Sequence, residues 1–77
     1  MPATIVAVDP LEQFAANLRR CRRNRGLSQQ RLAFDCKLHR TEVSLLERGD
    51  RNPRLSTNVR LARALGVSPA YLLEDVA

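Results

Sequence analysis

The side chains of this chain that could do chemistry are mainly arginines and small polar groups between residues 38 and 54. A helix that begins near residue 40 would place four of them on its outward face, namely Arg40, Thr41, Ser44 and Arg48. Guanidinium and hydroxyl groups of this kind suit the base edges and phosphates of nucleic acid. The pattern therefore predicts a nucleic-acid-binding surface.

The residue types needed for catalysis or metal binding are few and do not cluster. Cys21 and Cys36 form no C-x-x-C pair, and His39 is the single histidine, so a tetrahedral metal site lacks ligands. We interpret both cysteines as small buried hydrophobic residues rather than redox groups. No nucleophile, acid/base pair or phosphate loop accompanies His39, so we expect no enzyme, no metal and no cofactor.

Two short amphipathic helices, joined by a tight turn, position the polar surface. Ser28 caps the first helix, which Gln29 opens. The apolar positions on the helical period are Leu32, Ala33 and Cys36 in the first helix and Leu38, Val43 and Leu46 in the second. Arg48 and Gly49 close the second helix, since glycine tolerates the left-handed conformation of a helix C-terminus. DNA-binding proteins use tight helix pairs of this kind.

The remaining sequence predicts three more helices and no strands, which makes the fold class all-α. The three helices begin at Asp9 and Pro10, at Ser56 or Thr57, and at Ser68 and Pro69, and the first two end at Gly26 and Gly66. Their apolar positions are Leu11, Phe14, Leu18 and Cys21 in the first, Val59, Ala62 and Leu65 in the second, and Tyr71, Leu72 and Leu73 in the last.

Charge and length both favour a single DNA-binding module. The 77 residues include 13 basic and 8 acidic side chains, for a net charge of +5. Eleven of the 13 basic residues lie between Arg19 and Arg54, so the positive charge surrounds the helix pair and attracts polyanions. A chain of this length buries only about two-thirds of its unfolded surface. We therefore assign residues 9–77 to one domain, and expect no sensor domain and no small-molecule ligand.

Residues 1–8, MPATIVAV, are apolar but too short to span a membrane, and they lack the basic start and cleavage region of a signal peptide. We expect a flexible tail, because unanchored termini are usually disordered. The alternative is that Ile5, Val6 and Val8 cover part of a partner subunit. We expect no membrane contact and a cytoplasmic location.

The stretch from Leu27 to Arg54 resembles the helix-turn-helix of the Cro/repressor (Xre-type) family. The matching residues are Leu27, Ser28 and Gln29, Leu32 and Ala33, Leu38, Val43 and Ser44, and Glu47, Arg48 and Gly49. The resemblance covers residues 11–74 and implies a compact five-helix bundle of the lambda-repressor-like type. The family often has Gly where this chain has Lys37, which must accept a strained backbone angle or a different turn.

Within that family, the run from Leu38 to Asn52 looks like the controller proteins of restriction-modification systems, which are small dimeric regulators.

The resemblance implies roles for individual residues toward double-stranded DNA. Gln29 would bond a phosphate at a helix N-terminus, Arg40 would bind guanine O6 and N7, and Thr41 would contact a base or a thymine methyl. Ser44 and Leu45 would make secondary contacts near bases. His39 would cap the helix or contact a phosphate. The residues mainly on phosphates would be Arg48, Arg51, Asn52 and Arg54, and Arg51 would also be within reach of a base. Glu42 could accept from cytosine, orient Arg40 or face solvent, and we favour solvent.

Two further contacts are expected within and between subunits. The resemblance places Arg22 beside Glu47 in a mostly buried ion pair between the first and third helices; the alternative is a loose surface pair. Tyr71, Leu72 and Val76 would form the patch of a homodimer, unless Tyr71 and Leu72 simply pack on the fourth helix.

These features predict a sequence-specific DNA-binding transcriptional regulator that acts as a homodimer on an inverted repeat. The alternative is an antitoxin or another protein-interaction module that uses the same fold. An enzyme is the third class, and no residue pattern supports it.

Overall fold

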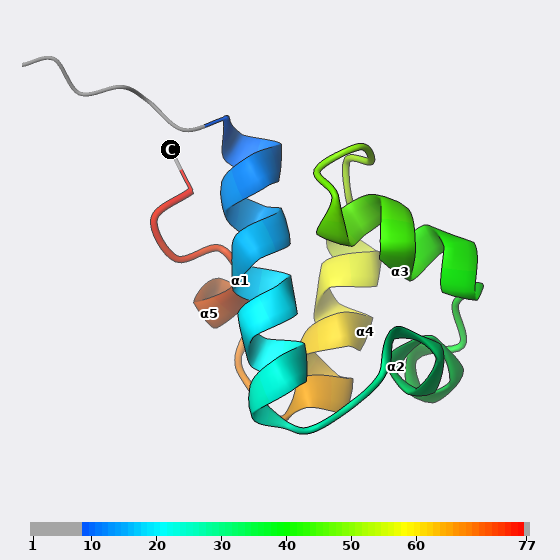
Figure 1. The fold of residues 1–77 in the computed structure, drawn as a ribbon. Coiled ribbons are helices and arrows are strands. Elements are labelled where there is room, and N and C mark those ends of the chain that lie inside the picture. Colours follow the sequence, from blue (N-terminus) through cyan, green and yellow to red (C-terminus); the bar gives the residue numbers. More distant parts are fainter. Residues whose placement is uncertain (1–8, 77) are drawn as a thin grey trace, which may run out of the picture.

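The computed structural model describes residues 9–76 and contains five helices in that range and no strand. They are α1 (Pro10–Asn24), α2 (Gln29–Cys36), α3 (Arg40–Glu47), α4 (Leu55–Leu65) and α5 (Pro69–Leu72), as labelled in Figure 1. The all-α, five-helix prediction is confirmed. The expectation of a flexible tail at residues 1–8 lies outside the described residues.

Side-chain caps set the starts of several helices. The Asp9 carboxylate accepts a hydrogen bond from the Leu11 backbone N–H at 2.8 Å, and Pro10 follows it at the first helical position. The Ser28 hydroxyl accepts from the Arg31 N–H at 3.0 Å and fixes the start of α2. Helix α4 differs from the prediction, because it begins at Leu55 with Arg54 at its cap position and has no side-chain cap.

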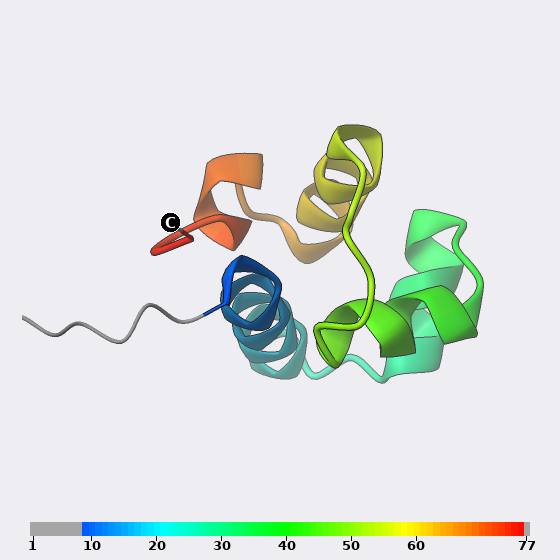
Figure 2. The same cartoon turned by 90° about the horizontal axis from the view of Figure 1, so that it is seen from above.

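All five helices contribute buried apolar side chains to one core. Its fully buried side chains are Leu18, Leu32, Val43, Leu46, Leu61, Leu65 and Leu72. Helices α2 and α3 lie on one side of α1 and α4, and α5 lies on the other side (Figures 1 and 2). The surface of the helix pair α2–α3 is therefore separate from the surface formed by α5.

The prediction that Val59 of α4 points into the core is wrong. Val59 is only half-buried, whereas Asn58 beside it is buried. The inward face of α4 is set by Asn58, Leu61 and Leu65, which recur at the helical period. The Nδ2 of Asn58 donates to the carbonyl oxygen of Pro69 at 3.3 Å, whereas its buried Oδ1 has no hydrogen-bond partner among the described residues.

Lys37 adopts the left-handed conformation that the family often gives to glycine. Its φ is 59° and its ψ is 41°, and it forms the C-cap of α2. Its exposed side chain avoids the core, but the Cβ still carries the steric cost of this conformation. Arg60 on α4 donates to the carbonyl oxygens of Cys36 at 2.7 Å and of Lys37 at 2.7 Å. These bonds satisfy the free carbonyls at the end of α2.

Both cysteines are free and buried, as expected for small hydrophobic residues. Burial raises the pKa of the Cys36 thiol to about 11, because a thiolate would lose its hydration. Burial also raises the pKa of Cys21. Neither thiol is in the state that favours redox chemistry.

Leu72 cannot belong to a dimer patch, contrary to our expectation, because its side chain is 0% exposed within the single chain. Asn17 on α1 fixes this segment, since its Nδ2 donates to the carbonyl oxygens of Leu72 at 2.9 Å and Glu74 at 2.8 Å. Val76 is half-buried and packs against the core. Tyr71 remains well exposed, with the Arg20 guanidinium over its ring.

Candidate nucleic-acid interface

His39 positions the first turn of α3. Its Nδ1 accepts a hydrogen bond from the backbone N–H of Thr41 at 3.0 Å, so His39 acts as the N-cap. Arg40 and Thr41 follow directly and are both exposed. The cap therefore fixes the backbone at the point where two of the predicted DNA-binding side chains leave the helix.

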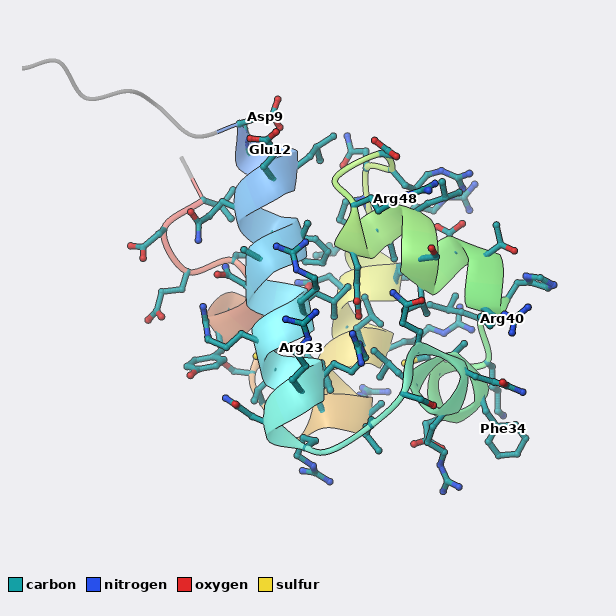
Figure 3. All side chains as sticks on the ribbon, in the orientation of Figure 1. Asp9, Glu12, Arg23, Phe34, Arg40 and Arg48 are labelled. Carbon is teal, nitrogen blue, oxygen red and sulfur yellow. The ribbon has the colours of Figure 1, made fainter. Side chains whose placement is uncertain are left out.

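The outward face of α3 carries the other predicted residues. Ser44 and Leu45 are half-buried one turn after Arg40, and Arg48 is exposed at the far end. Arg40 and Arg48 mark the two ends of the helix in Figure 3. The Nε of Arg48 lies 3.2 Å from Asp50 Oδ2, an exposed pair that water and phosphate can both compete for. This face offers hydrogen-bond donors along two turns of helix.

The opposite face of α3 is anchored to α1 by Glu47. The Arg22 Nε lies 2.5 Å from Glu47 Oε2, and the Arg22 Nη2 lies 2.9 Å from Oε1. The Glu47 side chain is 2% exposed and that of Arg22 is 12% exposed. Arg22 also donates to the Leu27 carbonyl oxygen at 2.8 Å. This bidentate ion pair fixes the angle of α3 relative to α1 and to the loop before α2.

Gln29 makes a contact that the sequence analysis did not include. Its Nε2 donates to Glu47 Oε1 at 3.0 Å, and the side chain is half-buried. One of the two N–H groups of this amide is therefore directed at Glu47, and the other is left for the proposed phosphate contact. The backbone N–H groups in the first turn of α2 remain the natural anion site at this position.

We had expected Glu42 to face solvent, but its carboxylate contacts an arginine. Its Oε1 lies 2.6 Å from the Nη1 of Arg51, in the loop between α3 and α4. The pair lines a groove of about 380 Å³, whose other lining residues are Leu38, Asn52, Arg54, Thr57 and Arg60. Asn52 and Arg54 are exposed at the edge of this groove. The two charged side chains lie on different segments, one on α3 and one in the loop after it, so helical periodicity gave no signal for their contact.

An exposed aromatic residue was also missed by the sequence analysis. Phe34 on α2 is largely exposed, and the Arg31 guanidinium lies 5.8 Å from the centre of its ring. Phe34 and Arg40 lie at the same end of the helix pair in Figure 3. Its exposure follows from the period of α2, because Leu32, Ala33 and Cys36 take the inward positions.

Within residues 9–76 there is no group of three or more histidine, cysteine or acidic side chains that could hold a metal ion. The same part of the chain contains no helix long and apolar enough to cross a membrane.

Helices α2 and α3 pack together and are joined by a short turn that contains the left-handed residue Lys37. The second helix has a solvated face, and arginines surround the pair. These features define a helix-turn-helix DNA-binding domain. The profile of the helix-turn-helix family matches residues 18–72, and the chain belongs to this family of transcriptional regulators.

Similar proteins include two named control proteins. The chain is 44% identical over 62 residues to control protein C.BamHI of Bacillus amyloliquefaciens, and the aligned region covers 79% of this chain and 76% of the relative. It is 44% identical over 71 residues to control protein C.SmaI of Serratia marcescens, which covers 92% of this chain and 84% of the relative.

A solved structure extends this similarity to the fold. The restriction-modification controller protein C.AhdI from Aeromonas hydrophila superposes with a TM-score of 0.79 at 44% identity, covering 80% of this chain and 94% of that protein. The resemblance to the Cro/repressor helix-turn-helix family and to controller proteins is thereby confirmed.

Proposed function

We propose that this chain is a controller protein of a restriction-modification system, a homodimeric regulator that binds a specific inverted repeat in double-stranded DNA. The single observation that carries the proposal is the capped, outward-facing start of α3, where Arg40 and Thr41 project from a helix anchored by the Arg22–Glu47 ion pair. The similarity to three control or controller proteins supports the biological role.

In this proposal α3 enters the major groove with its N-terminal end first. Arg40 binds O6 and N7 of a guanine with two guanidinium N–H groups, and Thr41 contacts the neighbouring base pair. Ser44 and Leu45 make secondary contacts with bases or methyl groups. The first turn of α2 and the side chains of His39, Arg48, Asn52 and Arg54 hold phosphates on either side.

The homodimer would form through the surface around α5. Tyr71 and Leu73 are exposed there, and Val76 lies beside them half-buried. Because α5 lies on the other side of α1 and α4 from the helix pair, this contact leaves α3 free to bind DNA. Two copies of α3 about 34 Å apart would meet successive major grooves on one face of the duplex. Duplex DNA as the ligand implies a cytoplasmic location.

Selection of bound duplexes from a random pool tests this function. The selection is run at roughly 150 mM salt, since purely electrostatic binding weakens steeply with salt. Enrichment of an inverted repeat, with a half-site spacing that fits two copies of α3, is the expected result. A folded protein that enriches no sequence would overturn the proposal and would favour a protein-interaction module such as an antitoxin.

A further inference from the structure

We propose that Glu42 is a positioning residue that determines DNA specificity, because it holds Arg51 toward a guanine and away from the phosphates. The inference rests on the proposed function and adds a second base contact to that of Arg40. Arg51 had been expected mainly to hold a phosphate, and Glu42 to face solvent.

The geometry of the pair favours a fixed arginine. The Nη1 of Arg51 lies 2.6 Å from Oε1 of Glu42, which is close enough for a strong charge-assisted hydrogen bond. The Glu42 side chain is 26% exposed and that of Arg51 is 48% exposed. Both side chains line the groove between α3 and α4, and the guanidinium is the more exposed of the two.

The backbone on both sides of the pair is also fixed. Glu42 lies in the first turn of α3, which His39 caps. The loop before Arg51 is tied back to α3, since the backbone N–H groups of Gly49 and Asp50 donate to the carbonyl oxygens of Leu46 at 3.2 Å and Leu45 at 3.0 Å. Gly49 makes this turn possible with a φ of 76°. An arginine held in this way loses little side-chain freedom when it binds.

Electrostatics then selects the kind of DNA group that Arg51 can bind. A phosphate brought to this guanidinium would also approach the negative carboxylate of Glu42, so part of the attraction is cancelled. The O6 and N7 atoms of guanine are uncharged acceptors and meet much less of this repulsion. A guanidinium has five N–H donors, so one can remain on Glu42 while two others bind the guanine edge.

Two other acid–arginine pairs in the described residues lie on the open surface and outside this groove. Arg31 and Asp35 lie one turn apart on the surface of α2, with Arg31 largely exposed. Arg48 and Asp50 are both largely exposed. Neither of these pairs lines the groove between α3 and α4. The Asp35→Asn variant is therefore a matched control, because it removes one negative charge from a surface pair.

The experiment measures binding of the full chain to the selected operator and to random duplex, at several salt concentrations. For Glu42→Gln we expect the ratio of operator to random affinity to fall by roughly tenfold, the scale of one bidentate base contact. We also expect the salt slope on random duplex to steepen by about 0.9, because the released Arg51 takes a phosphate. Asp35→Asn should leave the ratio and the selected sequence unchanged. Thermal melts verify that each variant is folded.

A double-variant cycle separates this role from a general effect of charge. Arg51→Ala should relax the preference at one base pair per half-site, and adding Glu42→Gln to it should not lower the ratio further. A folded Glu42→Gln variant with an unchanged ratio and base preference would overturn the inference, as would additive losses in the double variant. A wild-type protein that shows no preference at all would instead overturn the proposed function.

Discussion

Arg22 on α1 donates two guanidinium hydrogen bonds to the carboxylate of Glu47 on the inner face of α3. Gln29 from the start of α2 donates to the same carboxylate, and the Arg19 guanidinium donates to the Glu47 backbone carbonyl oxygen. A single acidic side chain thus joins the three helices that must keep a fixed geometry on DNA. Because the Glu47 side chain is buried away from water, its negative charge is stabilised by these partners instead.

Removing Arg22 should destabilise the fold strongly. We expect Arg22→Ala to lower the free energy of unfolding by about 3 to 5 kcal/mol, because Glu47 would remain charged and buried without its main partner. Urea denaturation followed by circular dichroism measures this change. Arg31→Ala, which breaks an exposed pair with Asp35, should cost less than about 1 kcal/mol. Similar losses for the two variants would contradict a structural role for the buried pair.

Lys37 should be replaceable by glycine with a gain in stability. The left-handed conformation costs a residue with a Cβ about 1 to 2 kcal/mol, and part of that gain is offset by the greater freedom of glycine in the unfolded chain. We therefore expect Lys37→Gly to raise the free energy of unfolding by about 0.5 to 1 kcal/mol.

Alanine at the same position provides the control for Lys37→Gly, because it removes the long side chain but keeps the Cβ. Lys37→Ala should give little or no gain in the same urea titration. Equal gains from Gly and Ala would show that the charge of Lys37, rather than its backbone angle, is unfavourable.

The parts of the structure that the sequence predicted depend on neighbours along the chain. The caps at Asp9 and Ser28 join atoms two or three residues apart, so they could be recognised before the fold was known. The apolar stripes of α1, α2 and α3 follow from the same short periods. These local features define the helix-turn-helix almost completely.

The parts that could not be predicted depend on how distant helices pack. Arg60 reaches the carbonyl oxygens at the end of α2 only because α4 crosses beside that helix. Glu42 finds Arg51 only because the loop after α3 turns back along it. Asn58 displaces Val59 from the core because a carbonyl oxygen of a following segment is placed to accept from it. In each case a polar group bonds to a partner that has no periodic signature in the sequence.

The two kinds of DNA contact should be separable by mutation. Arg40→Ala should cost about 1 to 3 kcal/mol on the preferred operator and relax the preference at one base pair. Arg54→Ala should weaken binding to all duplexes alike and flatten the salt slope by about one. Fluorescence anisotropy with operator and random duplex at several salt concentrations measures both effects. Equal losses on the two duplexes for Arg40→Ala would refute its contact with a base.

Substitutions in α5 should distinguish the dimer surface from the core. Tyr71→Asp places a charge on the exposed side of α5, within the proposed subunit contact. We expect a folded protein that sediments as a monomer, and we expect the unaltered chain to sediment as a dimer at the same concentration. Binding to a full inverted repeat should then weaken far more than binding to a half-site, because the second α3 no longer follows the first. Persistent dimers in this variant would place the subunit contact elsewhere.

Leu72→Ala should behave differently, because Leu72 is fully buried within the single chain. Its truncation leaves a cavity beside α1 and α4, which should cost about 2 to 5 kcal/mol of folding free energy. The expected result is a lower midpoint in urea measured on monomers, for example in the Tyr71→Asp background. A Leu72→Ala variant that loses dimers but keeps its full monomer stability would contradict the assignment of this residue to the core.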